Sequence, residues 1–216
     1  MAERPVFVPS LTGSQLVQEV QVRFRWHPGL APSQKKKNVQ ELHHAAVAYG
    51  LTPLLEISSK SDLEVGQKLS AFNLKVEVEG DTTTVECAFQ GSKVFEFGGP
   101  FPDLFRRTSR EAKRDPRLRE NGRLIEFKFE EKSYPISPVT VFYDWLYFRA
   151  LFSHRDWIAR RHEWAGFTDI EFNPERSINC QARSFAAFIS LLKRDRLEET
   201  MSSFEEFKVQ MESASL

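Results

Sequence analysis

The stretch that most constrains the fold is residues 84–95, TVECAFQGSKVF, which has the periodicity of a helix with one buried face. Small or apolar side chains occupy the i, i+3, i+4 and i+7 positions of that face, namely Val85, Ala88, Phe89 and Ser92. At about 100° per residue, three polar side chains fall on a different face, namely Glu86, Gln90 and Lys93. The pattern therefore predicts a helix from which an acid, an amide and an amine project together.

The same residues have a purely structural interpretation. Thr83 and Glu86 have the spacing of a capping box, in which the hydroxyl and the carboxylate satisfy the first free amides of a helix. Lys93 also fits a solvated lysine near a helix C-terminus, where positive charge is favoured. On spacing alone the structural interpretation is the commoner one, and the two roles are compatible.

Length and composition favour one globular domain with a substantial core. The 216 residues are 41% hydrophobic and 28% charged, with a formal net charge of zero. No global charge draws such a molecule to nucleic acid or to a membrane, so a nucleic-acid partner requires a local basic patch. No apolar run approaches the roughly 18 residues of a transmembrane helix, and MAERPVFVPSL lacks the apolar core of a secretory signal. We therefore expect a cytoplasmic protein with no membrane partner.

Strand and helix patterns are interspersed without the regular alternation of a doubly wound sheet. They predict the α+β class, with one mixed domain that is mainly helical around a small β-sheet. The expected strands are residues 20–26, 53–57, 74–79, 124–129 and 167–172. The other expected helices are residues 33–50, 108–114, 138–153 and about 177–192, with a charged amphipathic segment at 154–164 and an irregular wall at 95–105. Residues 1–216 are expected to form a single domain, with an N-terminal strand-helix-strand extension at 15–65, a core at 66–194 and a terminal helix at 195–216.

Motifs for cofactors and metals are absent from the sequence. No glycine-rich nucleotide loop, GxSxG elbow, HExxH or paired CxxC occurs, and the five histidines are scattered. We therefore expect neither a cofactor nor a metal. Cys87 and Cys180 fall in separate predicted helices and are expected to be buried free thiols.

Four segments together resemble the ordered motifs of the NADAR superfamily, the YbiA-like N-glycosidases: KLSAFNLKVEVEG, TTTVECAFQGSKVF, SREAKRDPRL, and TDIEF with NCQARSFAAFISLL. The resemblance covers roughly residues 66–194. Family positions are held by Leu69, Ser70, Phe72, Glu86, Gln90, Lys93, Ala112, Lys113, Asp169 and Asn179. The chain departs from the family pattern at Ala71, where asparagine is usual, at Cys87, where histidine is usual, and at Phe172-Asn173, where Trp-Gly is usual.

Further segments, among them KKKNVQELHHAA, LLEISSKS and FYDWLY, are similar to the NADAR branch of antitoxins paired with DarT-type DNA ADP-ribosyltransferases. That resemblance implies an enzyme that hydrolyses ADP-ribose from ADP-ribosylated guanine in DNA, with the cognate toxin as functional partner. Single-stranded DNA would be preferred, because extruding a base from a duplex costs a few kcal/mol. Two alternatives stay open, namely an N-glycosidase for a small phosphoribosylamine and a non-catalytic module that binds ADP-ribose or the toxin.

The resemblance also implies roles for individual residues. Glu86 would be the base or the group that stabilises the oxocarbenium ion, and Lys93 would hold phosphate or form a Schiff base with opened ribose. Asp169 would orient the ribose hydroxyls or serve as the second carboxylate. The candidate substrate contacts are Ser59, Lys60, Ser70, Phe72, Gln90 and Asn173. The candidate DNA contacts are Arg107, Arg110 and Lys113, for which an ordinary solvated basic surface is the alternative.

Overall fold

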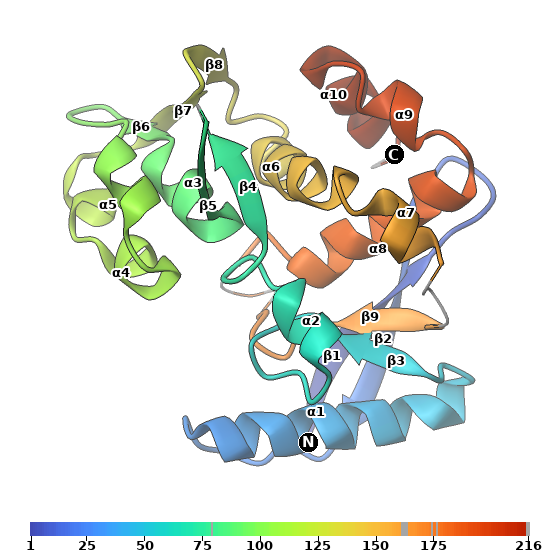
Figure 1. Cartoon of the computed structure of the whole chain (residues 1–216). Coiled ribbons are helices and arrows are strands. Elements are labelled where there is room, and N and C mark those ends of the chain that lie inside the picture. Colours follow the sequence, from blue (N-terminus) through green and yellow to red (C-terminus); the bar gives the residue numbers. More distant parts are fainter. Residues whose placement is uncertain (79, 161–163, 174, 176, 215–216) are drawn as a thin grey trace. The chain divides into compact units, whose positions relative to one another are not determined.

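The computed structural model describes residues 1–78, 80–160, 164–173, 175 and 177–214 (Figure 1). The chain packs as two compact units, one formed by Met1–Ser70 with His154–Leu216 and the other by Ala71–Ser153. Helices and small sheets occur in both units, which confirms the predicted α+β class. The division into an extension, a core and a terminal helix stays a prediction.

The first unit is built on a four-stranded sheet with the order β2-β1-β9-β3. Its strands are β1 (Ala2–Pro9), β2 (Val17–Phe24), β3 (Leu54–Glu56) and β9 (Gly166–Thr168). Strands β1 and β2 form a long antiparallel pair, whereas β9 pairs antiparallel with β1 and parallel with β3. The strand β9, which comes late in the sequence, thus lies between and pairs with two strands from the N-terminal third of the chain.

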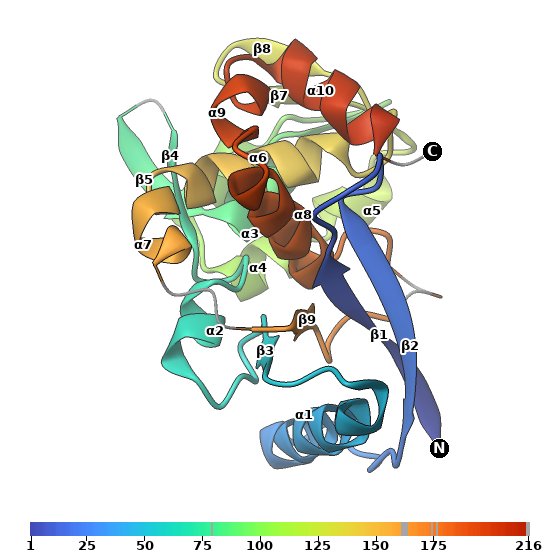
Figure 2. The ribbon, with the colours of Figure 1, turned by 90° about the vertical axis from the view of Figure 1, so that its right-hand side faces the viewer.

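Two helices cover this sheet from opposite faces, α1 (Pro32–Ala46) and α8 (Gln181–Lys193) (Figures 1 and 2). Under α1, buried side chains from the helix and the strands form one cluster that includes Val22, Leu42 and Leu54. On the other face, Phe185 of α8 meets Phe167 of β9 edge-on, with ring centroids 4.8 Å apart. The late helix expected from the sequence is present and buries one apolar face, although it begins at Gln181 rather than near residue 177.

The remaining elements of this unit are short. They are the 3-10 helix η1 (Val47–Tyr49), α2 (Glu64–Lys68), α7 (Arg155–Ala159), α9 (Leu197–Thr200) and α10 (Phe204–Ser213). Gly50 ends η1 with a φ of 72°, as expected for a glycine that terminates a helix. The charged segment predicted at 154–164 is helical over α7, and its residues 161–163 lie outside the described residues.

The second unit places α3 (Val85–Gly91) between two small sheets and several helices. The sheets are the hairpin of β4 (Lys75–Val78) with β5 (Asp81–Thr84), and the set β6 (Lys93–Phe95), β7 (Leu124–Phe129) and β8 (Lys132–Tyr134). The helices are η2 (Pro102–Arg106), α4 (Ser109–Arg114), α5 (Arg117–Glu120) and α6 (Val141–Phe152). Aromatic rings fill the core, and Phe127 stacks on Phe142 with centroids 4.5 Å apart.

The predicted helix at 84–95 is shorter than expected. It ends at Gly91, whose chain lies so close to η2 that an added Cβ would come within 2.4 Å of the Phe105 ring. Lys93 then enters β6 and pairs with Phe127. The prediction that Glu86, Gln90 and Lys93 share one helix is therefore wrong for Lys93, because pairing with a distant strand overrides the local helical pattern. The irregular wall predicted at 95–105 contains part of η2.

A second correction concerns helix starts. The N-cap of α3 is Thr84, whose Oγ1 accepts from the Cys87 amide at 3.2 Å, so Thr83 does not form the predicted capping box with Glu86. Thr83 instead donates its hydroxyl to the Phe105 carbonyl at 2.6 Å. Thr108 and Glu111 also have the sequence spacing of a capping box, and here the structure contains the box, at the start of α4.

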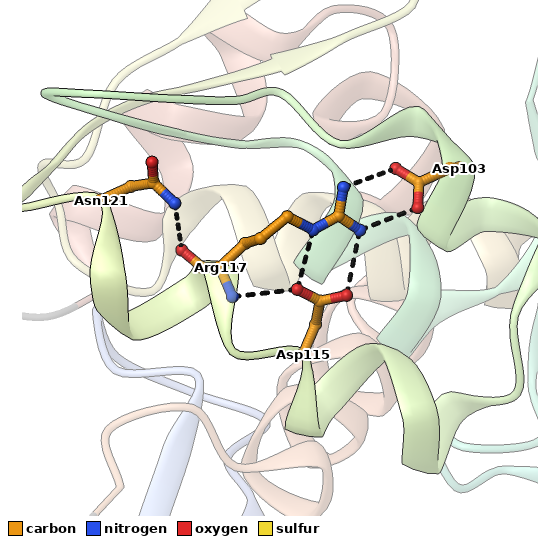
Figure 3. A network of polar contacts seen from close by, with 4 residues as sticks. All are labelled: Asp103, Asp115, Arg117 and Asn121. Atoms are coloured by element: carbon orange, nitrogen blue, oxygen red, sulfur yellow. Dashed lines mark hydrogen bonds and ion pairs between the residues drawn. The ribbon is translucent and has the colours of Figure 1, made fainter.

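A charged network fixes the segment between η2 and α5 (Figure 3). The guanidinium of Arg117 donates two hydrogen bonds to Asp103 of η2, at 3.1 and 2.8 Å, and two to Asp115, at 2.8 and 2.9 Å. These bonds hold the pKa of both carboxyls below the usual range and raise the pKa of Arg117. Asp115 directly follows α4, so one side chain ties the end of that helix to η2.

The turn between β7 and β8 is strained. Glu130 and Glu131 form it, and both have left-handed φ values, 49° and 59°. A two-residue hairpin of type I′ needs such values and favours Asn-Gly, whereas other residues lose about 1 kcal/mol. Replacing Glu131 with glycine is therefore expected to raise the free energy of unfolding by about 0.5–1 kcal/mol in urea denaturation.

Glu130→Gly is the matched control. Glu130 also binds Arg149 through two hydrogen bonds, at 2.6 and 3.1 Å, and losing them is expected to cancel any gain from relieving the turn. Unchanged or lower stability of Glu131→Gly would contradict the strain at this turn.

Candidate functional site

Polar and aromatic side chains of the second unit gather around α3. We call them the Glu86 cluster and define it as Phe72, Glu86, Phe89, Gln90, Lys93 and Lys113. Glu86 is buried, with an exposed fraction of 5%, and its Oε1 accepts from the Gln90 Nε2 at 2.9 Å. The Nζ of Lys113 lies 3.8 Å from the same oxygen. The acid and the amide thus meet as predicted, on successive turns of one helix.

The Glu86 carboxylate does not cap its helix. Thr84 provides the cap, and the Glu86 amide donates to the Ala71 carbonyl at 2.9 Å. The carboxylate contacts Gln90 and Lys113, whose side chains project from α3 and α4. A carboxylate held in this way is fixed in position and still able to interact with a substrate.

Lys93 reaches the same cluster from β6. Its Nζ lies 4.7 Å from the centroid of the Phe89 ring, in cation–π geometry. Burial lowers the pKa of Lys93 to about 8, the attraction of Glu86 raises it, and the charge of Lys113 lowers it again. An amine with this pKa is partly neutral near pH 8 and can act as a nucleophile.

Gln90 has an unused acceptor. Its Nε2 donates to Glu86, while its Oε1 has no hydrogen-bond partner among the described residues, although Gln90 is 7% exposed. A buried polar atom without a partner is costly in a folded protein and is rare outside functional sites. The amide oxygen is suited to accept a hydrogen bond from a sugar hydroxyl.

The three basic residues predicted to contact DNA separate in the structure. Lys113 belongs to the Glu86 cluster, where its Nζ also lies 5.1 Å from the centroid of the Phe72 ring. Arg107 follows η2 and is exposed, and Arg110 is exposed on α4. Lys113 is therefore closer to the candidate chemistry than the sequence indicated.

In the first unit, Asp169 belongs to a buried acidic pair with Glu56. The Glu56 carboxylate accepts from the Ser58 hydroxyl at 2.5 Å, the Thr168 hydroxyl at 2.6 Å and the Ile170 amide at 2.8 Å. Burial and repulsion by Glu56 raise the pKa of Asp169 to about 8, and burial raises the pKa of Glu56. Sequence reasoning did not single out Glu56, although an acid inside the apolar run PLLEI was a signal.

A histidine extends this network. The Nε2 of His43 lies 2.8 Å from the Thr168 Oγ1. Because the Thr168 hydroxyl donates to Glu56, its oxygen accepts from His43, which assigns the Nε2 proton to this ring. Burial lowers the pKa of His43 to about 4, in keeping with a neutral ring.

The other predicted substrate contacts of the first unit have local partners. Lys60 donates from its Nζ to the Ser59 hydroxyl at 2.8 Å, and Ser70 is buried. Asn173 accepts from the Glu175 amide at 3.1 Å through its side chain, which shapes the loop after Asp169. Their role toward a substrate stays a prediction.

The part of the chain that the structure describes contains neither a metal-type cluster of side chains nor a membrane-spanning helix. No group of three or more His, Cys, Asp or Glu side chains there is arranged to hold a metal ion. No described helix is long and apolar enough to cross a membrane. Cys87 and Cys180 are both buried free thiols, as predicted.

Comparison with known proteins identifies the family. A family model described as the DarT1-associated NADAR antitoxin matches residues 2–216, nearly the whole chain. No curated protein matches the chain. The family match confirms the resemblance found in the sequence motifs, and it extends that resemblance to the N-terminal segment and the C-terminal helices. The chain belongs to the family of DarT1-associated NADAR antitoxins.

Proposed function

We propose that this antitoxin is an N-glycosidase that releases ADP-ribose from ADP-ribosylated guanine in DNA, and thereby reverses the action of a DarT1-type toxin. The family match supports the antitoxin role and the cleavage of an N-glycosidic bond. The observation that carries the enzymatic proposal is the Glu86 cluster, which contains a buried carboxylate and a half-buried amine at two positions of the NADAR motifs. The charge of Glu86 also raises the pKa of that amine, on Lys93. A carboxylate can stabilise the positive charge that develops on the sugar carbon, and an amine can act as the nucleophile.

Cleavage of that bond places positive charge on the anomeric carbon of the ribose. A carboxylate near this carbon stabilises the charge, and the low polarity around a buried group strengthens the interaction. Glu86 fills this role, and the Gln90 and Lys113 side chains hold its Oε1 in place. The free Gln90 oxygen would accept from a ribose hydroxyl.

Lys93 acts as the nucleophile in this proposal. Its neutral amine attacks the anomeric carbon, a new carbon–nitrogen bond forms, and the bond to the guanine amine breaks while that nitrogen gains a proton. Opening of the ribose gives an imine, and water hydrolyses the imine to ADP-ribose and the free lysine. The proton balance requires an acid on the leaving side. The role of Asp169 as a second carboxyl group stays a prediction from the sequence resemblance.

Trapping with borohydride tests the role of Lys93. Reduction during turnover is expected to leave ADP-ribose bound to the peptide that contains Lys93, because borohydride converts the imine to a stable amine. Lys93→Arg is expected to give no adduct and to lower turnover by about 100-fold or more, since a guanidinium stays charged. Mass spectrometry of the digested protein locates the adduct.

The control for this experiment is Lys75→Arg, at an exposed lysine of β4. It is expected to trap as much ADP-ribose as the natural protein. If no adduct forms and Lys93→Arg is active, Lys93 is a phosphate contact rather than a nucleophile.

The substrate itself is tested by a direct comparison. Purified protein is expected to release ADP-ribose from an ADP-ribosylated guanine oligonucleotide, and to do so faster from single strands than from duplexes. Cleavage of a small phosphoribosylamine alone would instead support the riboflavin-intermediate type of N-glycosidase. Protection against the toxin without any release of ADP-ribose would support a binding module.

A further inference from the structure

The second unit contains a groove that the proposed chemistry does not use. It has a volume of about 890 Å³ and lies between the β4–β5 hairpin, η2 and the β7–β8 turn. A single small ligand usually occupies a pocket of about 300–1,000 Å³, so the groove is at the upper end of that range. Its walls come from three separate segments of one compact unit.

The wall of the groove is bonded to the start of α3. Thr83 lines the groove and donates its hydroxyl to the Phe105 carbonyl at 2.6 Å. The carbonyl of Arg107, another lining residue, accepts from the Cys87 thiol at 3.2 Å. Cys87 is adjacent to Glu86 in the chain, so the groove borders the helix that carries the candidate catalytic carboxylate.

The charges that line the groove are not balanced. The carboxylates of Asp103 and Glu130 are neutralised by Arg117 and Arg149, and Asp81 lies 4.0 Å from Arg106. Among the described residues, by contrast, no carboxylate lies within 4.0 Å of the charged groups of Arg107 and Lys128. Arg107 and Lys128 are exposed and line the groove together with the exposed Glu131, which is the only lining carboxylate of the described residues without an ion pair.

Aromatic and apolar groups line the same groove. Phe105 is partly exposed, Phe129 is buried, and the two rings meet edge-on with centroids 6.2 Å apart. Pro100 and Pro102 add apolar surface to the same wall. Cations that track a phosphate backbone, together with a ring on which a base can stack, are the usual components of a site for single-stranded nucleic acid.

We infer that this groove binds the nucleotides next to the modified guanine in single-stranded DNA, with Arg107 and Lys128 on phosphates and Phe105 against a base. The inference rests on the proposed function for the identity of the target base. It adds a second binding site, which gives the protein affinity for the DNA strand as well as for ADP-ribose. Unmodified single-stranded DNA therefore binds without any ADP-ribose.

The test uses the full chain and a fluorescent unmodified oligonucleotide of about ten nucleotides. Arg107→Gln combined with Lys128→Gln is expected to weaken binding about tenfold near 0.1 M salt, measured by anisotropy. The slope of log K against log salt is expected to fall by about 1.4, since each phosphate contact to a single strand contributes about 0.7. The matched control, Lys75→Gln with Arg119→Gln, removes two exposed cations of the same unit outside the groove and is expected to change affinity less than about twofold.

A second measurement links the groove to turnover. The double groove variant is expected to lower kcat/KM for a modified oligonucleotide about tenfold more than for ADP-ribosylated guanosine, which has no flanking nucleotides. Unchanged affinity and salt slope would overturn the inference. So would loss of binding to the toxin with unchanged binding to DNA, because the groove would then be a protein-docking site. The double variant could lose DNA binding while the natural protein hydrolyses no modified guanine. That result would support the groove as a DNA-binding site and would refute the N-glycosidase proposal.

Discussion

Replacing Glu86 with glutamine is expected to lower the rate of ADP-ribose release from a modified oligonucleotide by about 10²–10⁴-fold. Glutamine has nearly the same shape and can bond to Gln90, but it carries no charge to stabilise the developing oxocarbenium ion. The effect is expected mainly in kcat, because the lost interaction is strongest in the transition state. Release of ADP-ribose under single-turnover conditions measures the chemical step directly.

A change at a second glutamate separates loss of chemistry from loss of structure. Glu77 is exposed on β4, in the same unit, and Glu77→Gln is expected to keep the full rate. Thermal unfolding of both variants is expected to match that of the natural protein within a few degrees. Near-normal turnover by folded Glu86→Gln would refute the proposed role of this carboxylate.

The second large effect is expected at Asp169, whose replacement by asparagine should make the protein more stable at alkaline pH. The pKa of Asp169 is raised to about 8, well above its value in an unfolded chain, because the carboxyl is buried beside Glu56. Between about pH 4 and pH 8 the folded protein therefore holds a proton that the unfolded chain has released. The free energy of unfolding falls with rising pH across this window.

Asparagine has no proton to release, so it removes this dependence. Asp169→Asn is expected to be more stable than the natural protein by an amount on the order of 2–4 kcal/mol at pH 9, and by little near pH 4. Urea denaturation at several pH values measures the difference. Asp156→Asn, at an exposed position of α7, is the control and is expected to leave the pH dependence unchanged. A constant stability difference between Asp169→Asn and the natural protein from pH 4 to pH 9 would contradict the raised pKa.

Local patterns predicted much of the fold. The capping box of Thr108 and Glu111, the helix termination at Gly50 and the strand at 124–129 depend on residues close in sequence, and the structure contains all three. The strand β1 was missed because Pro5, Pro9 and Arg4 interrupt its apolar pattern. Its stability comes from pairing along its whole length with β2, which no local pattern shows.

The candidate site was predicted only in part, because some of its contacts join residues that are close in sequence and others join distant segments. Glu86 and Gln90 lie four residues apart on one helix, so their contact could be read from spacing. Lys93 joins them from a strand whose partner, Phe127, is distant in sequence. Glu56 and Thr168 are 112 residues apart, and the groove is formed by three separate segments. Such sites become visible only when the chain is folded.

The position of β9 between β1 and β3 has a consequence for synthesis of this antitoxin on the ribosome. The strands β1 and β3 emerge early from the ribosome. The strand that lies between them, β9 (Gly166–Thr168), must still be translated and leave the exit tunnel before it can pair with either. The Thr168 hydroxyl, which completes the hydrogen bonding of Glu56, arrives with the same segment. A nascent chain that ends before β9 can therefore pair β1 with β2, but it cannot form the complete four-stranded sheet.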